Sequence, residues 1–294
     1  PPRSPNGSER RAHHHGGSSV TYLLSAEGRR ALRTLTTRSI LYAFDFDGTL
    51  APISPNRDTV QIPPSINEWI KKLAKRAPCA IVSGRALADL APRVDGAVPH
   101  LIGNHGLESP CTAPATLIWA ENVCTEWMKQ VSTDFVQPLK DYGVEVENKR
   151  YSLTFHYRGT EEPARIFGAL LLFLNQLNPA PRLIFGKASV NVLPPGKGGK
   201  GPASLALMVH LRLAGLFFIG DDETDEDVFE LTEGLIMGVR VGRHAESRAQ
   251  YYVKDQGEIE DVIRFLVHQI DRTPESLDTN DRDTRDKKKA AHEL

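Results

Sequence analysis

Two aspartates stand two positions apart at the end of an apolar segment, in the run Phe44-Asp-Phe-Asp-Gly-Thr-Leu50. Side chains at positions i and i+2 of a strand point the same way, so Asp45 and Asp47 would lie together, with Gly48 allowing the chain to turn beneath them. Two like charges at a buried strand end are costly unless a cation joins them. The pair therefore favours a cation site over a strand that merely ends in polar loop residues.

A second acidic cluster, Gly220-Asp-Asp-Glu-Thr-Asp-Glu-Asp227, directly follows the apolar run 216–219. Oxygen ligands at this density suit a hard cation, Mg²⁺ before Ca²⁺. The EF-hand spacing is absent, because no glutamate closes a 12-residue loop that begins at Asp221. Glu226 and Asp227 could instead stabilise a helix N-terminus. That alternative does not cover Asp221, which comes before the helix.

A hydroxyl and an ammonium group stand between the two acidic clusters. Ser83 follows the apolar segment 79–82, and Lys200 lies in a Gly-rich turn before a predicted helix. Such groups hold the non-bridging oxygens of a transferred phosphoryl group. Each residue alone is weak evidence, since strand ends carry Ser routinely and Lys is usually solvated. The ordered set, with every member at a strand or helix end, predicts phosphoryl-transfer chemistry.

The turn before Lys200 also fits a dinucleotide-binding pattern. Residues 196–201 read Gly-Lys-Gly-Gly-Lys-Gly, they precede a helix, and Asp221 follows 20 positions later. However, Pro194-Pro195 breaks the tight strand-to-turn junction that this pattern needs, and two lysines in the turn suit a single phosphate better. A Walker A motif is excluded because Gly201 follows Lys200. We therefore interpret the turn as part of the phosphate site.

Short apolar segments alternate with helical patterns in both outer parts of the chain. Strands are predicted at residues 40–44, 79–82, 100–102 and 216–219. Helices are predicted at 65–73, where Ser65 and Glu68 form a capping box, and then from Arg85, at 201–213 and at 225–231. Strands that alternate with helices imply right-handed crossovers. We therefore predict an α/β fold with a Rossmann-like, doubly wound parallel sheet, covered by helices on both faces.

The middle of the chain has a different pattern, of helix, strand and strand twice over. Helices are predicted at 119–140 and 162–177, and strands at 144–147, 152–156, 183–185 and 189–193. This order indicates an antiparallel sheet with helices on one face, an α+β module inserted into the core. We call residues 111–192 the cap and assign residues 20–110 and 193–270 to the core. A disordered lead is predicted at 1–19 and a disordered tail at 271–294.

The charges of the chain balance overall. The 294 residues include 36 Lys plus Arg and 37 Asp plus Glu, which argues against nucleic acid or an anionic membrane as a partner. No apolar run approaches the roughly 18–20 residues of a membrane span. Three cysteines without a CxxC pair favour neither a disulfide framework nor a zinc site, so we expect a cytoplasmic protein. Residues 218–230 hold seven acidic residues and no basic one, whereas the cap holds eight of each sign.

The ordered motifs resemble a known group of enzymes. Asp45-Phe-Asp-Gly-Thr, Ser83, Lys200 and Gly220-Asp-Asp-Glu-Thr-Asp225 resemble the four motifs of the haloacid dehalogenase phosphatase superfamily. More narrowly, Ser83-Gly-Arg85, Gly103-Asn-His-Gly106 with Glu108, and residues 220–227 resemble the trehalose-6-phosphate phosphatases. The resemblance runs from about Ile40 to Ile270. It places the cap at the C2-type position, between Ser83 and Lys200, where it would close over the site.

This resemblance implies a Mg²⁺-dependent phosphomonoesterase that converts trehalose 6-phosphate to trehalose and phosphate, the final step of trehalose biosynthesis. Asp45 would be the nucleophile and form an aspartyl-phosphate, and Asp47 would be the general acid and base. Ser83 and Lys200 would clamp the phosphoryl oxygens. Mg²⁺ would be held by Asp45, the Asp47 carbonyl and Asp221, with water linking it to Asp222 or Asp225.

The resemblance also implies contacts with the sugar, a small-molecule partner. From the cap, the residues would be Glu147, Lys149, Arg158, Lys187 and Asn191. From core loops that face the cap, they would be Arg85, Asn104 and His105. For each of the charged cap residues, a solvated strand or turn charge stays an open alternative. Asn191 departs from the family, which commonly has Glu at this place, so the preferred sugar stays open.

Three other functions stay open on the sequence. One is the hydrolysis of another sugar phosphate, such as sucrose phosphate or mannosyl-3-phosphoglycerate. The second is a Mg²⁺-dependent phospho-receiver signalling module, which would need a lone acceptor aspartate and about 120 residues without a cap. The third is a catalytically inactive regulatory domain, disfavoured because both Asp45 and Asp47 are present. The sequence does not address the oligomeric state.

Overall fold

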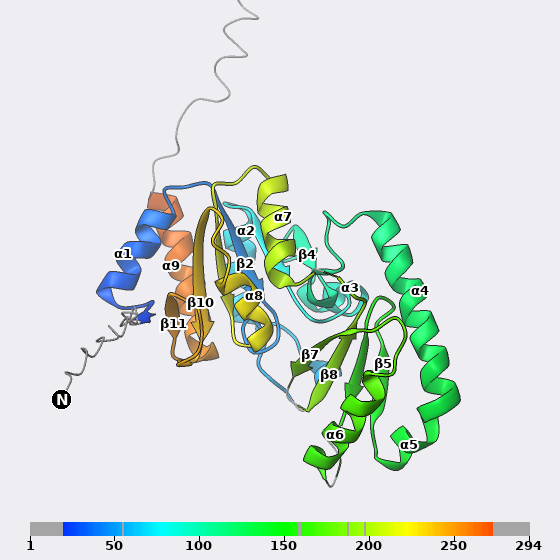
Figure 1. The fold of residues 1–294 in the computed structure, drawn as a ribbon. Helices are drawn as coiled ribbons and strands as arrows, with labels where there is room; N and C mark the ends of the chain where they lie inside the picture. The colour runs from blue at the N-terminus through cyan, green and yellow to red at the C-terminus, as the bar shows by residue number, and fades with distance from the viewer. Residues whose placement is uncertain are drawn as a thin grey trace, which may run out of the picture.

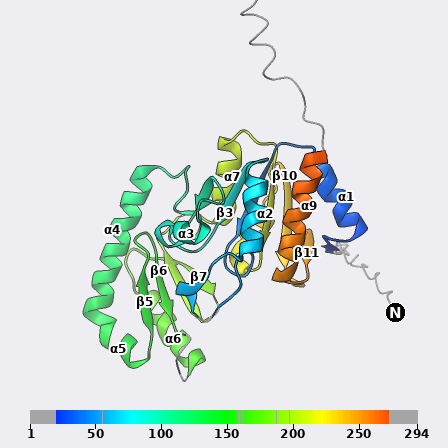
Figure 2. The same cartoon turned by 180° about the vertical axis from the view of Figure 1, so that it is seen from behind.

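The computed structural model describes residues 20–54, 56–157, 160, 162–186, 188–196 and 198–272. Two sheets organise these residues, and they lie side by side in opposite views of the molecule (Figures 1 and 2). The larger sheet has seven strands and the smaller has four. The smaller sheet comes from one continuous stretch in the middle of the chain, which confirms the prediction of an inserted α+β module.

The seven-stranded sheet is parallel at every pairing. Its order is β1 (Thr21–Tyr22), β11 (Tyr251–Val253), β10 (Leu235–Val241), β9 (Gly215–Gly220), β2 (Ile40–Asp45), β3 (Cys79–Val82) and β4 (His100–Ile102). Every residue of the central strands β2 and β9 is buried, as expected for strands covered on both faces. The predicted doubly wound parallel sheet is therefore confirmed.

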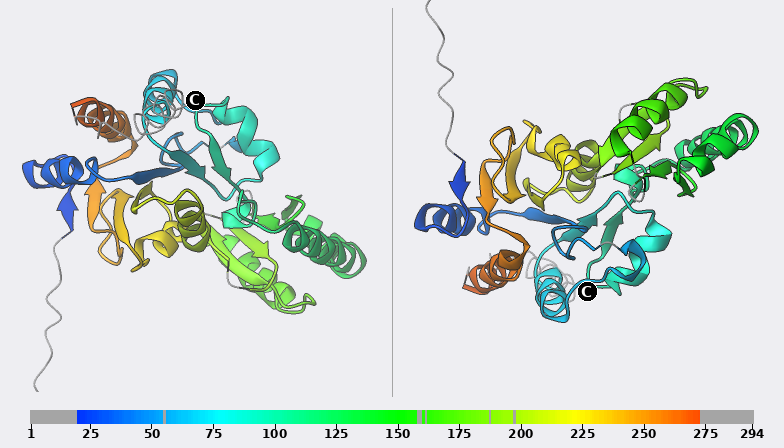
Figure 3. Two further views of the ribbon diagram at one scale, coloured as in Figure 1. Left: turned by 90° about the horizontal axis from the view of Figure 1, so that it is seen from above. Right: turned by 90° about the horizontal axis from the view of Figure 1, so that it is seen from below.

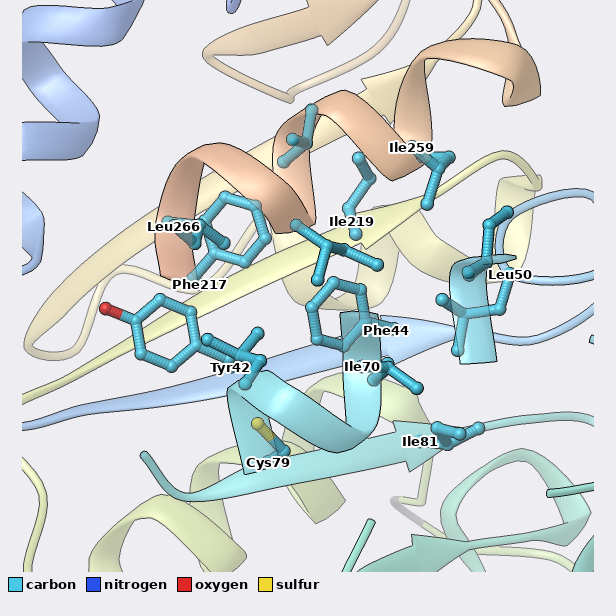
Figure 4. Close-up of a cluster of buried hydrophobic side chains, with 14 of the residues drawn as sticks. Tyr42, Phe44, Leu50, Ile70, Cys79, Ile81, Phe217, Ile219, Ile259 and Leu266 are labelled. Carbon is cyan, nitrogen blue, oxygen red and sulfur yellow. The ribbon is translucent and has the colours of Figure 1, made fainter. Parts of the chain in front are cut away.

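Helices cover both faces of this sheet, as the end-on views show (Figure 3). One face carries α1 (Ala26–Leu35), α2 (Pro64–Ala74), α3 (Leu87–Val94) and α9 (Ile259–Arg272), and the other carries α7 (Lys200–His210) and α8 (Glu226–Phe229). Under α2 and α9, Tyr42 and Phe44 pack with Phe217, Ile70 and Leu266 (Figure 4). The alternate residues of β2 and β9 pack against α7 and α8. This packing on both faces fixes the strand ends that carry the acidic motifs.

The four-stranded sheet is antiparallel, in the order β5 (Glu145–Asn148), β6 (Leu153–His156), β8 (Ser189–Leu193) and β7 (Arg182–Gly186). The helical elements of the cap are α4 (Pro114–Gln130), a π-helical turn (Val131–Phe135), α5 (Val136–Asp141) and α6 (Pro163–Leu174). On β6 and β8, side chains alternate between this helical layer and the opposite face. Leu153, Phe155, Val190 and Val192 pack with Trp127 in the cap's own apolar core. The residues between them face the larger sheet.

Several predicted helix boundaries are wrong, each for a local reason. The capping box at Ser65 does not form, because α2 begins at Pro64 with Pro63 before it and no side-chain cap, in keeping with the preference for proline in the first helical turn. A capping box forms instead between Asp222 and Asp225. The helix predicted at 119–140 begins at Pro114, and the π-helical turn divides it.

The expected disordered segments lie almost wholly outside the described residues. The exception is the start of the tail, since α9 continues to Arg272, two positions past the predicted boundary. Among the described residues, no helix combines the length and apolar character that crossing a membrane requires.

Candidate active site

The predicted chemical residues meet at one edge of the parallel sheet. Asp45 ends β2, Ser83 follows β3, Asp221 follows β9 and Lys200 begins α7. Ligands of open parallel sheets bind beyond the carboxyl ends of the strands. A cleft of about 710 Å³ opens here, and both this edge and the polar face of the cap sheet line it. The structure therefore brings the four motifs together beneath the cap.

A buried lysine joins two carboxylates at the floor of this cleft. Lys200 Nζ donates to Asp45 Oδ1 and to Asp225 Oδ1, each at 2.7 Å. The side chains of Lys200 and Asp45 are only 3% and 5% exposed, and that of Asp225 is fully buried. Burial alone would lower the pKa of Lys200, but the charges of Asp225 and Asp45 raise it above its ordinary value. The lysine is thus held as a cation beside the predicted nucleophile.

The electrostatics of Asp45 show why this site favours a further cation. Burial raises the pKa of Asp45 well above its ordinary value; Lys200 opposes this rise, while the charges of Asp225 and Asp221 add to it. A carboxylate in such a place is more readily ionised when positive charge is added nearby. One lysine among three neighbouring aspartates leaves an excess of negative charge. The site therefore suits a divalent cation.

Three carboxylates are close enough to share such an ion. One oxygen from each of Asp45, Asp221 and Asp225 lies within 4.8 Å of the others. An all-oxygen donor set fits Mg²⁺. Gly48 leaves room for the Asp221 carboxylate, because a Cβ at Gly48 would lie 2.3 Å from Asp221 Oδ2. The φ of Gly48 is +86°, a conformation that favours glycine. The third of these oxygens belongs to Asp225, and the prediction that water links Asp225 to the ion stays a prediction.

Asp222 has a different position from the other acidic residues of its loop. Its Oδ1 accepts a hydrogen bond of 2.7 Å from the Glu223 amide, and its own amide donates to Asp225 Oδ2 at 2.9 Å. These bonds fix the turn that carries Asp225. The prediction that water links Asp222 to the metal stays a prediction.

Asp47 lies on the open side of the site, paired with Arg85. Arg85 Nε and Nη2 donate to the two oxygens of Asp47 at 2.7 and 2.8 Å, and Nη1 donates to Asp89 at 2.7 Å. The Asp47 side chain is 42% exposed, unlike that of Asp45. Ser83 is buried, and its Oγ accepts a hydrogen bond from the Arg85 amide at 3.1 Å. The exposure of Asp47 gives it access to the cleft, which a proton donor for a departing group needs.

The loop after β4 carries two residues predicted to contact the sugar, Asn104 and His105, and only His105 lines the cleft. Asn104 does not line the cleft: its Nδ2 donates to Glu108 at 2.6 Å, and its Oδ1 accepts from Ser152 of the cap at 2.5 Å. His105 does line it, and its ring lies so close to Gly84 that a Cβ there would be 2.5 Å from it. Burial, aided by the charges of Lys149 and Lys200, lowers the pKa of His105 well below its ordinary value.

The cap wall brings Lys149 and Asn191 together. Lys149 Nζ donates to the Gly84 carbonyl of the core at 3.1 Å and reaches Asn191 Oδ1 at 3.5 Å. Asn191 Oδ1 also accepts from Thr154 Oγ1 at 2.8 Å. Burial, together with the charges of Arg57 and Arg85, lowers the pKa of Lys149 despite the nearby Glu147. This wall therefore offers an ammonium, an amide and a hydroxyl group to the cleft.

Glu147 is bound by a core residue that no sequence pattern marks. Arg57, from the loop after β2, donates to Glu147 Oε2 at 2.5 Å and contacts the His156 ring, and it also reaches Glu145 at 3.4 Å. His156 Nε2 lies 2.9 Å from Glu147 Oε2. Although burial opposes it, the contacts with His156, Lys149 and Arg57 lower the pKa of Glu147. Among the described residues, the ion pairs that join core and cap are those of Arg57.

Two residues predicted to contact the sugar, Arg158 and Lys187, lie outside the described residues. Their roles stay predictions. The neighbouring positions Tyr157, Gly186 and Ala188 are described, and the last two line the cleft.

Comparison with known proteins gives a consistent match. The sequence model of a family described as trehalose-phosphatase matches residues 43–256. The trehalose-phosphate phosphatase of Mycobacterium tuberculosis (strain H37Rv) is 32% identical over 206 residues, 67% of this chain and 52% of that protein. The trehalose 6-phosphate phosphatase RA3 of Zea mays is 26% identical over 256 residues, 79% of this chain and 70% of that protein. The chain spans about half the length of the mycobacterial relatives that it matches.

Solved structures share the fold. The C-terminal domain of C. albicans trehalose-6-phosphate phosphatase superimposes with a TM-score of 0.65 at 21% identity, covering 86% of this chain and 99% of that one. A trehalose-6-phosphate phosphatase related protein gives 0.61 at 20% identity, covering 78% and 97%. At these identities the likeness shows the fold, a parallel core with an inserted antiparallel module.

Proposed function

The chain belongs to the trehalose-phosphatase family, and from this premise we propose that it hydrolyses trehalose 6-phosphate to trehalose and phosphate, the final step of trehalose biosynthesis. The observation that carries the proposal is the buried group of Asp45, Lys200 and Asp225 at the floor of a cleft that the cap covers. The family match includes all of these residues. The cleft volume of about 710 Å³ is within the range of roughly 300–1,000 Å³ typical of ligand sites.

The proposed reaction has two steps. An Asp45 oxygen attacks phosphorus, the bond from phosphorus to the sugar oxygen breaks, and Asp47 gives its proton to that oxygen. The result is trehalose and an aspartyl-phosphate. Water then attacks the aspartyl-phosphate while Asp47 accepts a proton from it, which releases phosphate and restores both aspartates. The exposure of Asp47 and the burial of Asp45 support this division of roles.

Asp45, Asp221 and Asp225, with the Asp47 carbonyl, would hold Mg²⁺. When bound, the ion neutralises the charge between carboxylate and phosphate, which would otherwise repel. Lys200 supplies a second, permanent positive charge at the same place. With Ser83, it would hold the phosphoryl oxygens in line with Asp45.

Sugar recognition is assigned to the polar face of the cap sheet. Glu147 and Lys149 present opposite charges to the cleft, and Asn191 offers an amide in place of a carboxylate. Hydroxyl groups of a disaccharide can pair with all three side chains. Because Asn191 is neutral, another sugar phosphate is the second candidate substrate.

The remaining alternatives have less support. A phospho-receiver module would have no cap, whereas this chain has a four-stranded sheet between β4 and α7. All three cysteines are free, and Cys79 and Cys124 are buried, which supports a reducing, cytoplasmic setting. The near-zero net charge supports a small-molecule partner rather than nucleic acid.

The test is phosphate release from a panel of sugar phosphates with Mg²⁺ present. We expect kcat/KM for trehalose 6-phosphate to exceed that for sucrose phosphate and mannosyl-3-phosphoglycerate by at least about 10-fold. Equal values across the panel would contradict the substrate. An Asn191→Glu variant in the same panel tests the second candidate. If the neutral amide of Asn191 allows other sugar phosphates to be hydrolysed, the variant should hydrolyse fewer of them than the wild type. If only another sugar phosphate of the panel is hydrolysed, that compound and not trehalose 6-phosphate is the substrate.

A further inference from the structure

The acidic loop after β9 takes part of its counter-charge from a neighbouring strand, in addition to Lys200. Residues 218–230 contain seven carboxylates and no basic side chain. Arg240 lies on β10, in register with Gly220, the last residue of β9. Its side chain passes beneath the loop and is largely buried. The Arg240 cation therefore lies against the segment that carries the candidate metal ligand Asp221.

Arg240 binds the backbone of this loop rather than its carboxylates alone. Nη2 donates to the Asp221 carbonyl at 2.9 Å, and Nη1 donates to the Asp222 carbonyl at 3.1 Å. Nη1 also donates to Glu226 Oε1 at 2.6 Å. The planar guanidinium thus spans two successive carbonyls and a carboxylate, a geometry that the single ammonium of lysine does not reproduce.

The partner carboxylate is itself held in place. Glu226 Oε2 accepts a hydrogen bond of 2.8 Å from the Arg248 amide. Arg240 is therefore fixed from both sides, by β10 and by Glu226. Removing Arg240 would leave the Glu226 carboxylate without its counter-charge, which by charge alone would favour a bound cation rather than weaken its binding. The main loss is the support of the Asp221 and Asp222 carbonyls.

We propose that Arg240 is a positioning residue that sets Asp221 for a divalent cation. One oxygen of the Asp221 carboxylate lies within 4.8 Å of oxygens of Asp45 and Asp225, and repulsion among the three carboxylates opposes this arrangement before the ion binds. Bonds to two backbone carbonyls hold the loop against that repulsion. The inference rests on the proposed function only in that the site binds a divalent cation; it does not depend on which sugar is hydrolysed.

The test measures Mg²⁺ binding to the full chain without substrate, by isothermal titration calorimetry. We expect Arg240→Met to weaken Mg²⁺ binding about 10-fold, as loss of a partner that orients a metal ligand commonly does. Arg240→Lys should weaken it by a smaller factor, because one ammonium keeps the charge but not both carbonyl bonds. Arg248→Met is the matched control: its side chain is 72% exposed, only its backbone supports Glu226, and its Mg²⁺ affinity should equal that of the wild type.

A second readout separates positioning from general damage. At saturating Mg²⁺, kcat of the Arg240 variants should return to within about 3-fold of the wild type, because the ligands themselves are intact. Unchanged Mg²⁺ affinity in folded Arg240→Lys and Arg240→Met would overturn the proposal, as would a wild type that binds no Mg²⁺. A chain that binds Mg²⁺ with this dependence on Arg240 but releases no phosphate from any sugar phosphate would overturn the proposed function and leave this inference standing. If Arg240→Met does not fold, Arg240→Lys alone decides.

Discussion

The two walls of the cleft differ in how firmly each holds its lysine. On the core wall, Lys200 makes two hydrogen bonds of 2.7 Å to buried carboxylates. On the cap wall, Lys149 makes bonds of 3.1 and 3.5 Å to a carbonyl and an amide. Lys200 begins α7 and meets Asp45 at the end of a buried parallel strand, whereas Lys149 follows the last residue of β5 in the cap sheet and borders the cleft.

This difference indicates a division of labour. Tight pairing fixes atoms that must meet the phosphorus within a fraction of an ångström. Looser pairing leaves donors and acceptors available to the hydroxyl groups of a sugar. We therefore expect changes on the core wall to lower kcat for every phosphate ester, and changes on the cap wall to raise KM for large substrates alone.

The largest effect is expected from Asp45→Asn. The amide is a poor nucleophile, so kcat for phosphate release should fall by at least about 1,000-fold for trehalose 6-phosphate and for p-nitrophenyl phosphate alike. Phosphate release with Mg²⁺ present measures both. Substantial turnover by the purified variant would contradict the covalent mechanism, and a loss confined to the sugar substrate would contradict the division between the walls.

The second effect concerns Lys200→Met, which should lower kcat about 100- to 1,000-fold with both substrates, as loss of one charge-stabilising donor does. It also leaves Asp45 and Asp225 facing each other without a buried cation, so the free energy of unfolding should fall by about 3–5 kcal/mol. Urea unfolding at pH 7.5 measures this change. An unaltered stability would mean that protonation of Asp45 compensates for the missing charge.

The matched change on the cap wall is Lys149→Met. It removes the same ammonium group, but we expect KM for trehalose 6-phosphate to rise about 10-fold with little change in kcat, because the lost interaction is made with the sugar. The kinetics of p-nitrophenyl phosphate should be unaltered. A fall in kcat with the small ester would place Lys149 with the chemistry and break the comparison.

The smallest effect is a dependence of the free energy of unfolding on pH, caused by His105. The lowered pKa of His105 means that the folded chain keeps this ring neutral where the unfolded chain binds a proton. Stability is therefore full above the ordinary pKa of 6.5 and is lost as the pH falls from there toward the folded pKa. The slope is about 1.4 kcal/mol per pH unit in that window.

The check for His105 is urea unfolding at pH 7.5 and 5.5. We expect the wild type to lose about 1 kcal/mol more than His105→Gln over this interval, since glutamine has no proton to bind. Equal losses in the two proteins would show that other groups cause the acid sensitivity.

Much of the core could be predicted from the sequence because its signals are local. The apolar runs of β2, β3 and β9 end in the residues that carry the chemistry, so the strand pattern alone places Asp45, Ser83 and Asp221 at one edge. The wrong helix starts have local causes too. Prolines at 63, 64 and 114 decide them, and the π-helical turn that divides the cap helix ends three positions before Pro138, a residue type that interrupts helices.

Contacts between distant parts of the chain could not be predicted in this way. Arg57 meets Glu147 across 90 positions, and Arg240 meets Asp221 across 19. Each arginine stands alone in its segment, and only the packing of the cap or the pairing of β10 with β9 brings it to its partner.

The alternation along β6 and β8 has a consequence for how this chain could diversify. Leu153, Phe155, Val190 and Val192 maintain the cap's own stability, while the positions between them, Thr154, His156, Ser189 and Asn191, border the cleft. The two sets lie on the same strands but on opposite faces of the cap sheet. We therefore expect substitutions in the second set to alter sugar recognition while the cap's apolar core stays intact. Thr154 and Asn191 share a hydrogen bond, so their substitutions should not act independently.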